Sequence, residues 1–292
     1  MSAALIAVVV ALLLGHFLPG LVAVRRYDWF VAWLQWLARN SGRDWPGRVG
    51  LLLAIGVPVL VVASLQYGLH EQWLGLPGFL LALAMLLYTW GPGDLHQDVE
   101  AVIDAREPEA RREAARQLYP EGGEPAIEGP RLVEAVFRCA LWRWFGVLFW
   151  FVLLGPAGAL LYRLLSLCAQ GEGRQRLDSG QRGDAATWLA WMNWPVAQLM
   201  TFALALAADF DRVLGAWREA HAEGATLDLG YLGAAARVSV DCELAEDEVY
   251  AVDGSALGPD LLELRDAMSL AWRVLLLWLG VLALFVLAGW AT

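Results

Sequence analysis

The sequence predicts an all-α integral membrane protein, a bundle of five to six hydrophobic helices with one helix broken or re-entrant and with helical cytoplasmic loops. Of the 292 residues, 59% are hydrophobic, which is above the roughly 45–50% usual in soluble domains. Apolar runs near the length that crosses ~30 Å of hydrocarbon recur along the chain. Backbone groups in lipid must be satisfied within their own segment, so each run is expected to be a helix. The runs are Ala4–Leu18, Val49–Tyr67, Pro77–Trp90, Phe145–Leu167, Trp188–Ala208 and Leu270–Trp290.

The arginines predict the orientation of the first spans in the bilayer. The stretch RRYDWFVAWLQWLARN at 25–40 is rich in aromatic and basic residues, which is typical of an amphipathic helix at the membrane interface. Arginines also crowd the connection at 91–143 but are absent from 68–75. By the positive-inside rule, the first and third connections are cytoplasmic and the N-terminus is outside. Many of the 16 tryptophans lie near span ends, as in an interfacial aromatic belt.

We treat 1–292 as a single membrane domain with two large polar loops. The loop at 91–135 is predicted to be helical, acidic at its start and basic further on, with Pro108 dividing it. The loop at 209–269, between the last two spans, is predicted to form helices with an acidic strip at 241–248. This strip lacks the ordered spacing of a calcium loop and is expected to be a solvated face.

The run Phe145–Leu167 contains Gly155, Pro156 and Gly158 near its centre. These residues favour a broken or re-entrant helix surrounded by protein. If the run spans the membrane, the following arginines face outward against the usual bias, and if it re-enters they remain cytoplasmic. Both alternatives stay open, and the side on which 209–269 lies depends on them.

Composition excludes several kinds of chemistry. The chain has no lysine, so a Walker A phosphate loop and Schiff-base catalysis are impossible. The net charge of −10 makes nucleic acid an unsuitable partner. Cys139, Cys168 and Cys242 show no metal-ligand spacing, so we expect free structural thiols, no metal and no cofactor.

Polar residues at span ends are the candidate ligand-binding residues. Asp94, His96, Asp98 and Glu100 alternate after the third run, a spacing that suits a divalent cation but also an acidic helix N-terminus with an exposed imidazole.

Arg143 and Arg163 bracket the broken helix. They either snorkel to the interface or, with the amides freed at the break, form an anion pocket. Asn193, close to Pro195, faces the same cavity or packs against a neighbouring helix.

Two segments carry a resemblance to a known family. FWFVLLGPAGALLYRLL (149–165) and NWPVAQL (193–199) resemble the CobD/CbiB family of membrane proteins, which includes the adenosylcobinamide-phosphate synthases and implies nucleotide-dependent amide ligation. The chain departs from that family's polar motifs. Phe137–Gly146 has no carboxylate where the family has E-N…D-G, LLSLCAQ replaces an Asn and Asp motif, and Gln198 stands in place of an Arg. Ligation needs acidic groups to hold magnesium, so cobinamide synthesis is not expected.

The order of spans and loops, including an H-x-D…R-E-A-A-R-Q-L loop, is similar to the AmpE branch of regulatory signalling modulators. This resemblance implies a multi-pass protein of the bacterial inner membrane that acts beside the amidase AmpD in β-lactamase induction linked to peptidoglycan recycling. We expect no catalytic residues. Arg143, Arg163 and Asn193 are expected to line a ligand cavity, with Asp94, His96 and Asp98 at its mouth.

The partners implied are the lipid bilayer, an anionic ligand such as a muropeptide fragment or nucleotide, and a membrane protein or second copy of the chain. Two alternatives remain. The first is a membrane amide ligase with a rearranged acidic site that includes Asp94, Asp98 and Asp178. The second is a transporter, against which the absence of paired internal repeats argues.

Overall fold

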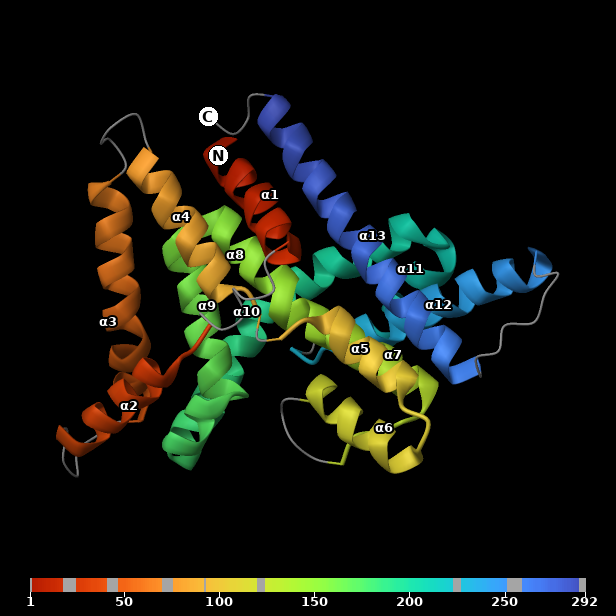
Figure 1. Cartoon of the computed structure of the whole chain (residues 1–292), viewed down its shortest axis with the longest axis horizontal. Helices are drawn as coiled ribbons and strands as arrows, with labels where there is room; N and C mark the ends of the chain where they lie inside the picture. The colour runs from red at the N-terminus through yellow and green to blue at the C-terminus, as the bar shows by residue number, and fades with distance from the viewer. Residues whose placement is uncertain are drawn as a thin grey trace. The chain divides into compact units, whose positions relative to one another are not determined.

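A computed structural model of the chain describes residues 2–17, 25–40, 47–69, 76–91, 93–119, 124–222, 227–250 and 259–288 (Figure 1). Within these ranges every regular element is helical. The prediction of an all-α protein is therefore confirmed.

Among the described residues, four helical stretches are long and apolar enough to cross a membrane: Gly47–Gly68, Gly129–Leu154, Ser179–Ala207 and Leu261–Leu287. Leu76–Thr89 and Pro156–Ala169 are shorter apolar helices. The membrane character of the chain is supported at this level, whereas a bundle of five to six spans stays a prediction. The first predicted run falls on α1 (Ser2–Phe17), and the ends of the first and last runs, Leu18 and Trp290, lie outside the described residues.

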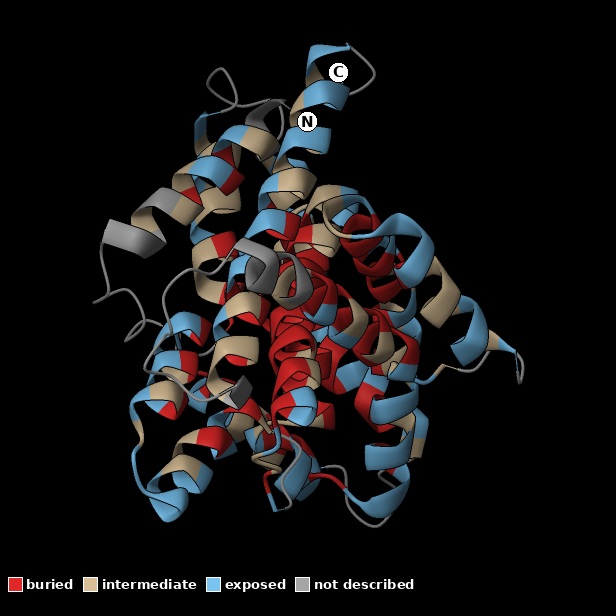
Figure 2. Ribbon diagram, turned by 90° about the vertical axis from the view of Figure 1, so that its right-hand side faces the viewer, coloured by how far each residue is buried: buried red, intermediate tan, exposed pale blue. Residues whose placement is uncertain are grey.

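Helices α3 (Gly47–Gly68) and α13 (Pro259–Leu287) expose much of their apolar surface. Figure 2 shows buried, intermediate and exposed residues along the described helices. Leu60 on α3 is 66% exposed, and Leu284 on α13 is 67% exposed. Continuous apolar surface of this kind is unfavourable in water but matches lipid chains. The run Gly129–Leu154 is different because most of it is buried by protein.

The chain folds into two compact units. Unit 1 comprises residues 1–92, 146–192 and 282–292, and unit 2 comprises residues 93–145 and 193–281. Besides α1 and α3, unit 1 contains α2 (Asp28–Asn40), α4 (Leu76–Thr89), α8 (Gly146–Leu154), α9 (Pro156–Ala169) and the start of α10 (Ser179–Ala207). In this unit α4 packs against α1 and α9, and α3 packs against α9 (Figure 1).

The predicted break in the run Phe145–Leu167 lies at Gly155, where φ is +72°. This left-handed value suits glycine, which lacks a Cβ. A Cβ on Gly146 would lie 2.1 Å from Tyr162 Cζ, and one on Gly158 would lie 2.3 Å from the Trp150 carbonyl oxygen. These contacts pair residues in reverse order along α8 and α9, so the chain turns back at Gly155 and the two helices pack antiparallel.

A hydrogen bond joins α2 to α3 where a proline interrupts the hydrogen bonds of α3. Pro58 lies inside α3 and has no N–H to donate to the carbonyl of Ala54, four residues earlier. The indole Nε1 of Trp33 donates to that carbonyl oxygen at 3.1 Å. A side chain of one helix thus satisfies the acceptor that proline leaves free in another, as required where water is excluded.

Unit 2 is built around α7 (Gly129–Ala140), whose leucine, valine and phenylalanine side chains are buried. The helix continues as a π-helical segment, η5 (Leu141–Phe145). Helix α7 packs against α5 (Leu95–Asp104) and α12 (Gly230–Tyr250), while α11 (Phe210–His221) packs on α12 and α6 (Pro108–Ala115) on α5. Helices α5 and α6 occupy the predicted 91–135 loop and are separated just before Pro108.

The predicted 209–269 loop contains α11, α12 and the start of α13. Helix α13 begins at Pro259, well before the apolar run at Leu270, because proline is favoured in the first turn and the polar residues that follow are compatible with a helix outside lipid. Asp241 and Glu243 of the acidic strip lie on α12, and the side chains at 246–248 lie outside the described residues.

Replacing Gly158 by Ala should lower the free energy of unfolding by about 1–3 kcal/mol, because the new methyl group meets the backbone of α8. Gly56→Ala is the matched control, since nothing lies within 4 Å of its Cβ position in α3. The control should be neutral or stabilising by up to about 1 kcal/mol. Unfolding of purified protein in detergent measures both, and equal effects of the two substitutions would contradict the close helix packing.

Candidate functional site

The residues predicted at the mouth of a ligand cavity begin helix α5. Asp94 is its N-cap, and its carboxylate accepts a hydrogen bond from the His96 backbone N–H at 3.0 Å. His96 Nε2 lies 3.2 Å from a carboxylate oxygen of Glu100, one turn further along, and both side chains are half exposed. In the described ranges, no group of three or more His, Cys, Asp or Glu residues is arranged to hold a metal ion. The geometry is that of a capped acidic helix N-terminus.

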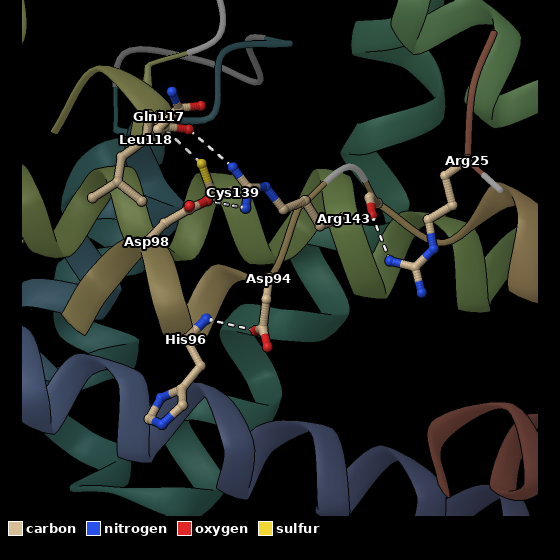
Figure 3. A network of polar contacts seen from close by, with 9 residues as sticks. Arg25, Asp94, His96, Asp98, Gln117, Leu118, Cys139 and Arg143 are labelled. Carbon is tan, nitrogen blue, oxygen red and sulfur yellow. Dashed lines mark hydrogen bonds and ion pairs between the residues drawn. The ribbon is translucent and has the colours of Figure 1, made fainter. Parts of the chain in front are cut away.

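Arg143 forms the main polar contact of unit 2 (Figure 3). Its guanidinium donates to Asp98 Oδ2 at 2.5 Å and to the Gln117 carbonyl oxygen at 2.9 Å. Arg143 is 8% exposed and lies in the π-helical segment η5. This network joins η5 to α5 and to η4 (Arg116–Leu118).

Two neighbouring features support this network. The Cys139 thiol donates to the Leu118 carbonyl oxygen at 3.2 Å (Figure 3). Gly93 has a φ of +70°, and a Cβ there would lie 3.6 Å from both the Arg143 guanidinium and the Asp98 carboxylate. A π-helical turn is uncommon and often marks a functional position, so this network is the candidate site of unit 2.

Arg163 lies in unit 1, where it contacts the C-terminal end of α4. Its Nε donates to the Thr89 carbonyl oxygen at 2.8 Å, and it is 2% exposed. The carbonyls at a helix C-terminus have no intrahelical donor and carry partial negative charge. Two other side chains also serve this end: Arg25 donates to the carbonyl oxygens of Leu87 and Gly91, and Tyr27 donates to that of Tyr88. The three side chains together cap α4.

The backbone at the Gly155 break also has protein partners. Gln66 of α3 accepts a hydrogen bond from the Ala157 N–H at 3.3 Å and donates to the Leu154 carbonyl oxygen at 3.4 Å. In the anion-pocket alternative the amides freed at the break face a ligand, and in the structure the side chain of Gln66 is bonded to the Ala157 amide.

The structure brings Asp98 and Arg143 together, with Asp94 and His96 on the same helix as Asp98. Arg163 belongs to the other unit, and Asn193 is buried on the part of α10 that belongs to unit 2. A common cavity lined by Arg143, Arg163 and Asn193 stays a prediction. Asp178, a candidate of the ligase alternative, accepts from the Gln181 N–H at 2.7 Å at the start of α10.

A second network was not predicted. Gln198, which stands where the CobD/CbiB family has Arg, accepts a hydrogen bond from Trp217 Nε1 at 2.8 Å, and its amide nitrogen lies 3.2 Å from His221 Nε2. His221 Nδ1 lies 2.9 Å from the Trp217 carbonyl oxygen. Since a carbonyl only accepts, Nδ1 carries the proton and Nε2 accepts from Gln198. In the sequence, Gln198 is notable only because it departs from the family motif. Its hydrogen bonds could not be predicted, because both partners lie on a separate helix.

No protein-family model, curated protein sequence or solved structure matches this chain. The family resemblance carried by GPAGALLYR (155–163) therefore stays a prediction.

Breaking the ion pair between Arg143 and Asp98 should lower the free energy of unfolding strongly. A double-mutant cycle with Arg143→Ala and Asp98→Ala should give a coupling of about 2–4 kcal/mol, since a charge left without its partner in a mostly buried position is costly. The exposed pair Arg116 and Glu113 is the control, with an expected coupling below about 1 kcal/mol. Couplings of equal size would show that the buried pair has no special role.

Arg163→Met should destabilise the protein by about 1–3 kcal/mol, because the buried Thr89 carbonyl loses its donor. Arg48→Met removes an exposed arginine whose partner is Asp184, and it should cost less than about 1 kcal/mol. Thermal unfolding in detergent compares the two. An Arg163 variant as stable as the Arg48 variant would rule out the capping role.

Proposed function

We propose that this chain is a multi-pass protein of the bacterial inner membrane that modulates signalling in the manner of AmpE, in the control of chromosomal β-lactamase induction. In this proposal the apolar helices anchor the protein, and the polar helices of unit 2 respond to a ligand or contact a protein partner. The proposal gives the chain no amide-ligase activity.

One observation carries the proposal: the residues that produce the family resemblance have structural roles here. Gly155 has the left-handed backbone of the helix reversal, and Gly158 allows α9 to touch α8. Tyr162 packs over Gly146, and Arg163 caps α4. The motif thus serves as a scaffold, which a signalling relative of an enzyme family can keep after its catalytic groups have been replaced.

The segment Phe137–Gly146, where a ligase of the CobD/CbiB type has acidic residues, supports the same proposal. Phe137–Gly146 forms the buried end of α7, the segment η5 and the first residue of α8, and the charged residues in it are Arg138 and Arg143. Asp94, Asp98 and Asp178, the carboxylates of the ligase alternative, each hold a backbone N–H or an arginine. These bonds explain the carboxylates without a magnesium ion.

The charges of α6 offer a surface for a partner. Its sequence, PEARREAA, places mostly exposed arginine and glutamate side chains next to the Arg143 network. A change in the pair between Arg143 and Asp98 would act on η4, and η4 directly continues α6. This connection is how we propose that ligand occupancy is passed to a partner protein.

Complementation tests the proposal. In a Gram-negative strain that lacks its AmpE-type protein, this chain should restore the induction of chromosomal β-lactamase by a β-lactam to the parental level. Arg143→Ala should fail to restore it because α5 and η4 lose their common partner. Arg218→Ala, which changes an exposed arginine of α11, should restore it fully.

Immunoblots of membrane fractions show whether each variant is present at the wild-type level. Induction that is the same with and without the chain would contradict the signalling role. Growth on cobinamide of a strain that lacks adenosylcobinamide-phosphate synthase, restored by this chain, would support the ligase alternative.

A further inference from the structure

A hollow of about 470 Å³ lies in unit 2 between α7, α12, the end of η4 and the irregular segment at 124–127. This volume is within the range of roughly 300–1,000 Å³ that is usual for small-molecule sites. Helix α7 supplies the wall with Arg131, Glu134 and Arg138, and η5 supplies Trp142. These residues are three or four positions apart, so they share one face of the helix.

The hollow has a surplus of positive charge, although the whole chain has a net charge of −10. Three arginines line it, against two glutamates. One of these glutamates, Glu134, forms an ion pair with Arg237 of α12. Arg131 makes a long contact of 3.4 Å with Glu128, in which both side chains are largely exposed. Such a contact is weak and readily exchanged.

Arg138 differs from its neighbours. Within the part of the chain that the structure describes, its side chain forms neither a hydrogen bond nor an ion pair, and the residue is only partly exposed. A guanidinium has five N–H donors in a planar fork that fits phosphate and carboxylate groups. Arg138 thus presents an available donor group at the wall of a hollow.

Two aromatic residues complete the wall. The Tyr119 hydroxyl donates to the Arg131 carbonyl oxygen at 3.2 Å, which fixes its ring beside α7. Burial raises the pKa of Tyr119, so this phenol stays neutral and adds no negative charge to the hollow. Trp142 is 4% exposed. Rings held in this way offer an apolar surface to the organic part of a ligand.

A second hollow in the same unit provides a contrast. It measures about 450 Å³ and shares Arg237, but Glu219, Asp241 and Glu263 line it. Its carboxylates would repel an anion. The two hollows are alike in size and opposite in charge, so charge distinguishes their ligands.

We propose that the hollow at Arg138 binds a small molecule with a phosphate group, with Arg138 as the residue that pairs with the phosphate and Tyr119 and Trp142 beside its organic part. The volume exceeds what a phosphate ion fills, so the ligand is a phosphate ester. The ester is either soluble or a phospholipid head group. This inference does not rest on the proposed signalling role, because binding is measured on the purified protein.

Calorimetric titration of the full-length protein in detergent tests the proposal, with adenosine monophosphate as the soluble ester, adenosine as its phosphate-free match and short-chain phosphatidic acid as the lipid. Binding of the monophosphate but not adenosine would identify a soluble ester. Binding of phosphatidic acid alone would identify a head group. Either result supports the phosphate site, whereas binding of none of the three, or equal binding of adenosine and its monophosphate, would overturn it.

Arg138→Gln should weaken binding at least about tenfold, because a charge-assisted pair is lost. Arg138→Lys keeps the charge but lacks the planar guanidinium, so its affinity should lie between those of the unmodified protein and Arg138→Gln. Arg218→Gln, which changes an exposed arginine on α11, should stay within about twofold of the unmodified protein. Thermal unfolding without ligand shows whether each variant is folded. If Arg138→Gln is unfolded, Arg138→Lys decides, and affinity unchanged in a folded Arg138 variant would overturn the assignment.

Discussion

Every carbonyl that loses its helical partner inside an apolar protein must be given another donor, and this constraint explains several polar contacts of unit 1. An unsatisfied carbonyl in such surroundings costs several kcal/mol by order of magnitude. Trp33 donates to the carbonyl freed by Pro58, and Gln66 donates to the Leu154 carbonyl at the Gly155 break. Arg25 and Arg163 serve the end of α4. These four side chains are therefore explained by the backbone acceptors to which they donate.

Charge is used differently in unit 2. There Arg143 joins separate helices through Asp98 and the Gln117 carbonyl, and Gln198, Trp217 and His221 form a neutral chain of hydrogen bonds. A neutral chain in which each donor meets an acceptor suits a partly buried position, since it needs no counter-ion. Among the described residues of unit 2, Arg143 and Asp98 form a largely buried ion pair, and Gln198, Trp217 and His221 form an uncharged network.

The sequence predicted the all-helical class, the helix break and the division before Pro108, because these depend on local features: hydrophobic runs, glycine and proline. It left open whether the run Phe145–Leu167 spans or re-enters, since the packing of Gly158 on Trp150 depends on tertiary contacts. It identified Arg143 and Arg163 as telling residues, but not their carbonyl partners, which lie 26 and 74 residues away along the chain. It did not single out Arg138, because the hollow beside this arginine is formed by segments that are separate in the sequence.

The bond between Trp33 and Ala54 also determines where α2 sits along α3. Ala54 lies seven residues beyond the start of α3 at Gly47, which is roughly 10 Å along the helix axis. In a regular helix each carbonyl of this stretch is already occupied, so an indole sliding along the surface finds no equal acceptor at other levels. The location of Pro58 in the sequence thereby determines the level along α3 at which α2 binds. Moving this proline by one helical turn would move the free carbonyl, and with it the contact of α2, by one turn.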